Sequence, residues 1–182
     1  MRPILFTKVV ALGLLTVPGH ALGADGPATF KAGEFTFQRP SGWQWVETSS
    51  AMRKAQLKIS GADKKESAEV IFFHFGEGGG GGTQANIDRW FSQFQEPKDQ
   101  LHTKVEEVTV GKHKVTYVQA QGTYMSGIPG GPKTPQPGTA LLGAILESPQ
   151  GNVFVRLTGP VMLTRASEGA FRKMIGSALG SG

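Results

Sequence analysis

Cysteine is absent from this chain of 182 residues. Without a thiol, the protein has no disulfide bond, no thiolate metal site and no cysteine nucleophile. The lipid-modified cysteine that tethers a bacterial lipoprotein is excluded for the same reason. Because many secreted animal proteins depend on disulfides, this absence fits a bacterial periplasm better than an animal secreted fluid.

Clusters of basic residues and long apolar runs are also missing. The formal net charge is +5, but lysine and arginine are spread thinly and balanced by acids, whereas nucleic-acid-binding proteins gather them on one face. We therefore expect no nucleic acid as a partner. No segment approaches the roughly 20 apolar residues that a membrane-spanning helix needs, so we expect no stable membrane anchor.

The first 24 residues have the composition of a secretory signal peptide. Arg2 and Lys8 supply a basic start, a short apolar run follows, and small residues allow cleavage before Ala24 or Asp25. The pattern predicts an exported protein that is periplasmic or secreted, and soluble once the signal is removed.

The rest of the chain predicts one domain over residues 34–180, after a flexible lead-in over residues 25–33. Alternating apolar and polar residues indicate half-buried strands, as at Phe35 and Phe37. The segment 68–75 is almost continuously apolar, which is typical of a strand covered on both faces, so we place it inside the sheet. Further strands are expected at 43–45, 52–59, 105–110, 115–124, 139–147 and 153–157, with a two-residue turn at Gly111-Lys112.

Two amphipathic helices are expected to pack on this sheet. The first has Thr83 as its predicted N-cap, places Asn86 on its polar side and ends at Pro97. Its apolar stripe consists of Ile87, Trp90, Phe91 and Phe94. The second begins near Thr164, and its buried stripe consists of Phe171, Met174, Ile175 and Ala178. The predicted fold class is α+β, with a mostly antiparallel sheet of about six or seven strands.

Residues 35–43, FTFQRPSGW, resemble the F-x-F-x-x-P-x-G-W opening of the PsbP/Mog1-like proteins. The order of elements and the closing amphipathic helix are also similar to that fold. The family includes a subunit at the lumenal face of photosystem II, a nuclear partner of a small GTPase and many exported bacterial proteins. The resemblance implies a central antiparallel sheet sandwiched by helices, and a scaffold that docks onto other proteins rather than one that catalyses a reaction. It implies no particular binding residue.

Five consecutive glycines separate the apolar strand from the first helix, a position at which phosphate-binding loops occur. A Walker loop requires Lys followed by Ser or Thr after its last glycine, and a dinucleotide site requires spaced glycines between parallel strands. Neither pattern is present. Two interpretations remain, a flexible connector or a loop that binds an anion or small ligand. The residues of that loop are Gly78, Gly79, Gly80, Gly81, Gly82 and Thr83.

Residues 125–138 contain four prolines and four glycines, so no regular element is expected there. A long loop between two core strands often carries binding function. The segment is therefore either a disordered excursion or a loop that docks a partner. The docking interpretation rests on Met125, Ile128, Pro129 and Pro132.

No catalytic or metal-binding arrangement is recognised in the sequence. Ser126 does not stand in a G-x-S-x-G motif. Glu106 and Glu107 are adjacent on a predicted strand and so point to opposite faces, which prevents them from acting as an acid–base pair. Metal-ligand spacings are missing among the histidines of the mature chain, His74, His102 and His113. We expect no metal and no cofactor.

These observations favour an exported, non-enzymatic α+β domain that acts through contacts with another envelope protein. The alternative is a small-ligand or anion binder that uses the glycine-rich loop and the start of the first helix. A hydrolase ranks third, because its catalytic residues cannot be assembled from this sequence.

Overall fold

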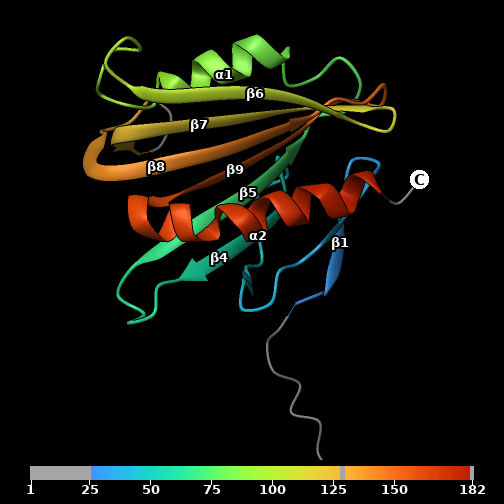
Figure 1. The fold of residues 1–182 in the computed structure, drawn as a ribbon, viewed down its shortest axis with the longest axis horizontal. Coiled ribbons are helices and arrows are strands. Elements are labelled where there is room, and N and C mark those ends of the chain that lie inside the picture. The colour runs from blue at the N-terminus through green and yellow to red at the C-terminus, as the bar shows by residue number, and fades with distance from the viewer. Residues whose placement is uncertain (1–25, 128–129, 181–182) are drawn as a thin grey trace, which may run out of the picture.

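The computed structural model describes residues 26–127 and 130–180, which form a seven-stranded antiparallel sheet, a two-stranded sheet and two helices (Figure 1). The large sheet has the strand order β3-β4-β5-β9-β8-β7-β6. The predicted α+β fold class is confirmed, and the predicted signal segment lies outside the described residues. In chain order the elements are β1 (Thr29–Ala32), β2 (Phe35–Gln38), β3 (Gln44–Trp45), β4 (Arg53–Ser60), β5 (Ser67–His74), α1 (Thr83–Phe91), β6 (His102–Val110), β7 (His113–Ser126), β8 (Thr134–Leu146), β9 (Val153–Pro160) and α2 (Val161–Leu179).

Strand β5 lies between β4 and β9, inside the sheet, as its apolar run predicts. Val70, Ile71 and Phe72 are all buried although they alternate between the two faces. A strand with both faces covered must have packing layers on both sides of the sheet. The two layers are different in composition and extent.

Helix α2 and the β1–β2 pair cover one face, which we call the inner face. From α2, Phe171, Met174 and Ile175 enter the core beneath it. The helix begins at Val161, earlier than the predicted start near Thr164, because it follows directly on Pro160 at the end of β9. Figure 1 shows α2 running diagonally across the strands.

The β1–β2 pair completes the inner layer and corrects the predicted flexible lead-in over residues 25–33. Thr29–Ala32 form β1, in which Phe30 and Ala32 alternate inward and are buried. The ring centroids of Phe30 and Phe37 lie 4.9 and 5.0 Å from that of Phe72. These aromatic contacts hold the segment in place. The sequence does not indicate them, because the residues around Phe30 show no apolar periodicity.

Helix α1 covers the other, outer face over β7, β8 and part of β9. The predicted stripe is confirmed, since Ile87, Trp90, Phe91 and Phe94 are all buried. The ring of Trp90 occupies the place that a Cβ atom would take on Gly143 of β8. None of the described β4 residues belongs to this second core cluster. The outer face of β4, of the start of β5 around Glu69 and of the end of β9 is therefore left without a helix on it (Figure 1).

The ends of α1 differ from the prediction. Gly82 rather than Thr83 is the N-cap, and no side chain in the described part of the chain caps the helix. The Thr83 hydroxyl instead donates a hydrogen bond to Glu147 Oε1 at 3.0 Å. The helix ends at Phe91, before Pro97, because the chain then extends beside the last residues of β7.

The proline- and glycine-rich segment 125–138 is more regular than its composition suggests. Strand β7 continues to Ser126 and β8 begins at Thr134, with Tyr124 opposite Gln136 and Met125 opposite Pro135. We call this two-stranded extension, residues 123–127 and 134–138, the arm. A register shift between Gly122 and Tyr124 separates the arm from the rest of the β7–β8 ladder. The expectation of no regular element is therefore wrong for residues 125–126 and 134–138, which are half of the segment.

Candidate binding groove

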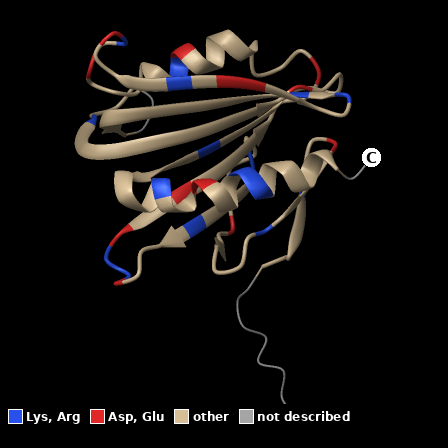
Figure 2. Ribbon diagram, in the orientation of Figure 1, with Lys and Arg blue, Asp and Glu red and all other residues tan. Residues whose placement is uncertain are grey.

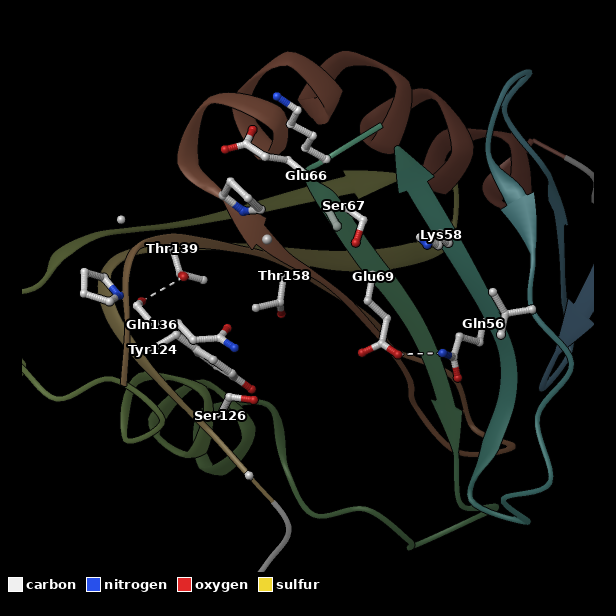
Figure 3. Close-up of a pocket in the computed structure, with 18 of the residues that line it drawn as sticks. Gln56, Lys58, Glu66, Ser67, Glu69, Tyr124, Ser126, Gln136, Thr139 and Thr158 are labelled. Atoms are coloured by element: carbon white, nitrogen blue, oxygen red, sulfur yellow. Dashed lines mark hydrogen bonds between the residues drawn. The ribbon is translucent and has the colours of Figure 1, made fainter. Parts of the chain in front are cut away.

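The uncovered part of the outer face forms a groove of about 850 Å³ between β4–β5 and the arm (Figure 3). Its floor contains Gln56, Lys58, Glu69 and Thr158. The arm supplies the opposite wall with Tyr124, Ser126, Gln136, Pro137 and Gly138, and Thr139 follows where β8 rejoins the sheet. Hydroxyl and amide groups thus predominate among the side chains that Figure 3 shows around the groove.

Three floor residues hold one another in place. Gln56 donates to Glu69 Oε1 at 2.6 Å, and Arg53 Nη1 donates to Gln56 Oε1 at 2.7 Å. The same guanidinium lies 3.5 Å from Glu69 Oε1. These contacts hold the three side chains in a fixed arrangement, and the Arg53 guanidinium partly balances the charge of the Glu69 carboxylate.

Gln93 connects the floor, the arm and the chain after α1. Its Oε1 accepts hydrogen bonds from Tyr124 Oη at 2.7 Å and from Arg156 Nη1 at 2.6 Å. The rings of Tyr124 and Phe94 make an edge contact with centroids 5.5 Å apart. These contacts fix the tyrosine in the groove wall and link its position to the packing of α1.

Glu96 fixes the base of the arm. Both of its carboxylate oxygens accept a hydrogen bond from the backbone N–H of Thr123, at 2.9 and 2.8 Å. This hydrogen bond favours the ionised carboxylate and lowers the pKa of Glu96 below its ordinary value. Gln95 N also donates to Thr123 O, and Met125 N donates to Gln93 O. The arm is therefore bonded along one side to residues 93–96.

Two polar atoms near the groove have no partner within the described part of the chain. They are Thr158 Oγ1, on a groove-lining residue, and Arg156 Nε, on the next outer-face residue of β9. An unsatisfied buried polar atom costs about 1–3 kcal/mol. Hydrogen bonding within the chain is thus incomplete on this part of the face.

The groove also presents positive charge. Lys58 and Lys65 line it and are exposed, and neither ammonium makes an ion pair with any residue that the structure describes. The exposed carboxylate of Glu66 stands beside them. Since Arg53 is paired with Glu69, these two lysines are the cations available to a ligand.

The glycine-rich loop has a structural explanation. Asn86 is buried, contrary to its predicted place on the polar side of α1, and its Nδ2 donates to the carbonyls of Gly80 at 2.8 Å and Gly82 at 3.0 Å. Gly78, Gly80 and Gly81 have positive φ, which favours glycine. The loop is hydrogen-bonded rather than a loose connector, and it presents carbonyls to Asn86. Anion binding at Gly78, Gly79, Gly80, Gly81, Gly82 and Thr83 remains a prediction.

The predicted docking residues are distributed around the arm. Met125 is half-buried within it, Pro132 is exposed just beyond it, and Ile128 and Pro129 lie outside the described residues. The sequence analysis did not predict the floor, because polar residues such as Gln56 and Glu69 simply match the solvent side of an alternating strand. The bonding of β5 to β9, which are distant in sequence, is what brings Glu69 opposite Thr158.

The remaining sequence candidates are apart from the groove. His74 Nε2 lies 3.1 Å from the Gln150 carbonyl oxygen, and the His113 ring packs edge-on against Phe35. Glu106 contacts Arg172 of α2, whereas Glu107 contacts Lys114, so the two acids do point to opposite faces as predicted. Within residues 26–127 and 130–180, no three potential metal ligands cluster and no helix is long and apolar enough to span a membrane.

The fold is similar to that of a solved structure. The solution structure of cyanobacterial PsbP (CyanoP) from Synechocystis sp. PCC 6803 superimposes with a TM-score of 0.50 at 12% sequence identity. The match covers 88% of this chain and 98% of that one. No family model matches the sequence, and no curated protein matches it. The similarity supports the PsbP-like fold implied by residues 35–43.

Proposed function

We propose that this protein is an exported, non-enzymatic domain that acts by binding another envelope protein, and that the partner docks in the groove. The observation that carries the proposal is the uncovered part of the outer face. A single helix covers only the rest of this face, and the arm turns the uncovered part into a polar groove of about 850 Å³. The PsbP-like fold is compatible with a domain that works through such contacts.

The chemistry of the groove fits an extended segment of polypeptide with acidic side chains. Hydroxyl groups such as those of Ser126 and Tyr124 and the amide of Gln136 can donate to and accept from a peptide backbone. Lys58 and Lys65 then supply the complementary charge for carboxylates of the partner. The floor carboxylate of Glu69 is already bonded to Gln56 and paired with Arg53, so we assign the contact with the partner's carboxylates to the two lysines.

Photo-crosslinking tests the location of the docking site. A photoreactive amino acid at Ser126, expressed in the native host, is expected to give one discrete adduct with an envelope protein. The same residue at Met162, which is 75% exposed on α2, is the control and is expected to give none. Export is read from the same sample, because the adduct should lie in the envelope fraction and contain a chain that starts at Ala24 or Asp25.

Charge reversal tests the acidic character of the partner. K58E/K65E is expected to reduce the Ser126 adduct several-fold, because it replaces the free cations of the groove with anions. K31E makes one such reversal on β1, away from the groove, and should leave the yield unchanged, whereas K58E and K65E taken singly should each reduce it. Equal adducts from Ser126 and Met162, or equal losses with K31E and the groove variants, would contradict the proposed docking site.

A further inference from the structure

Strand β6 is the outermost strand at one end of the large sheet, and its nine residues make a long edge. The opposite end is formed by β3, which has only two residues. Natural proteins commonly shorten, cover or charge such edges, because an unpaired strand pairs readily with another chain. Strand β6 carries the charged residues Lys104, Glu106 and Glu107, but it is long, and two of its apolar side chains are well exposed, Val105 at 47% and Val110 at 42%.

The alternation of hydrogen bonds shows which backbone groups of β6 face outward. Glu147 N donates to the Lys114 carbonyl, so the backbone groups of Lys114 point toward β8. Because these directions alternate along a strand, the even-numbered residues in this part of β7 bond to β8 and the odd-numbered residues bond to β6. Odd-numbered residues of β7 are paired with even-numbered residues of β6. The backbone groups on the open side therefore belong to Thr103, Val105 and Glu107.

We propose that β6 pairs antiparallel with β6 of a second copy of this chain, about a two-fold axis at Val105. In this register Val105 faces Val105 of the other copy, and Thr103 faces Glu107. All of these residues direct their N–H and C=O groups outward, so the interface forms a regular ladder. The two sheets become one continuous antiparallel sheet, and the exposed Val105 side chains are buried against each other.

Charge complementarity selects this register. Lys104 of each copy stands opposite Glu106 of the other, and both side chains lie on the inner face, where Glu106 already contacts Arg172. Figure 2 shows this sequence along β6 as a blue segment followed by a red one. Axes at Lys104, Glu106 or Glu107 would place like charges directly opposite each other, which is unfavourable. Axes at Thr103, Val108 and Thr109 would leave only three, five and three residues of β6 paired, against seven for the axis at Val105.

Sedimentation velocity of the wild-type mature chain over a concentration series tests the association. We expect reversible dimers, and V105K should raise the dissociation constant at least about tenfold by placing two lysines face to face. V110K is the matched control, because Val110 is equally exposed but would pair with residue 100, beyond the start of β6. Circular dichroism of both variants establishes that each is folded. A monomeric wild type, or equal effects of V105K and V110K, would overturn the proposal.

A distance measurement tests the register itself. Because the chain has no cysteine, T109C gives a single site for a nitroxide label. Thr109 lies four residues from the proposed axis, so the two labelled Cα atoms should be about 27 Å apart at roughly 3.4 Å per residue. Double electron–electron resonance measures this range. A dimer with a clearly different separation would overturn the register, and neither outcome depends on the groove or its partner.

Discussion

Asn86 determines the conformation of the glycine-rich loop at the level of a single side chain. Its amide donates to carbonyls of Gly80 and Gly82, and its Oδ1 accepts from Arg89 Nη1 at 3.1 Å. The loop also passes so close to Phe75 and Phe154 that a Cβ atom on Gly80 would collide with both rings. The turn over these two aromatic side chains thus depends on glycine at several of the five positions, and the amide of Asn86 holds it.

Replacing Asn86 with alanine is therefore expected to destabilise the protein by about 1–2 kcal/mol, because the buried amide loses several hydrogen bonds to the loop carbonyls, each worth about 0.5–1.5 kcal/mol. Urea denaturation followed by circular dichroism measures the change. Gln84→Ala is the control, since Gln84 is exposed on the same helix turn and its loss should change the free energy of unfolding by no more than about 0.5 kcal/mol. If the two variants are equally stable, the loop does not depend on this amide.

At the scale of elements, the contact between α1 and β8 depends on the absence of a side chain at Gly143. The ring of Trp90 fills that position. A nine-residue helix is short for independent stability, so its place on the sheet depends on packing of this kind. The stripe that contains Trp90 is visible in the sequence, whereas its pairing with one particular glycine is not.

Gly143→Ala is expected to destabilise the protein by about 1–3 kcal/mol, because the new methyl group has to displace a buried indole. Gly176→Ala makes the same chemical change on α2, where the added Cβ meets open space, and should stabilise by about 0.5–1 kcal/mol. Thermal and urea unfolding of both variants compare the two effects. Changes of the same sign at both positions would contradict the packing argument.

The elements also show why some of the structure was predictable from the sequence and some was not. Strand β5 and the Gly111-Lys112 turn follow from local rules, since an apolar run and a two-residue hairpin with glycine first are both local signals. The arm does not follow from local rules, because its prolines suggest irregular structure. The backbone N–H and C=O groups of Thr134 and Gln136 face β7. Pro135 and Pro137 alternate with these residues, so their nitrogens point away from β7, where no N–H group is needed.

The same limit applies to the groove. The sequence singled out residues 125–138 as a docking segment, and parts of that segment line the groove, but Met125 and Pro132, on which the docking interpretation rests, do not. Its floor depends on register across β4, β5 and β9, which places Gln56, Glu69 and Thr158 on one face. Register between strands distant in sequence is set by the whole core, and no local pattern contains it.

For the whole molecule, the unequal covering of the two faces is the property from which the groove follows. The inner layer consists of a nineteen-residue helix and the β1–β2 pair, whereas the outer layer is a nine-residue helix over part of the face. Gln93, just beyond α1, bonds to Tyr124 in the arm. Loosening of α1 would therefore release a contact that positions the groove wall.

Native-state hydrogen exchange tests this unequal stability. The amide of Trp90 in α1 is expected to exchange faster than that of Phe171 in α2, because segments with fewer buried contacts open locally below the global free energy of unfolding. Exchange at Trp90 should also depend weakly on added urea, as local opening exposes little surface, whereas exchange at Phe171 should depend on it steeply. Gly143→Ala should accelerate exchange across α1. The opening free energy at Phe171 should still equal the global free energy of unfolding of the variant. Equal protection of both helices, with the same urea dependence, would mean that the outer layer unfolds only with the core and that the groove wall is as rigid as the sheet.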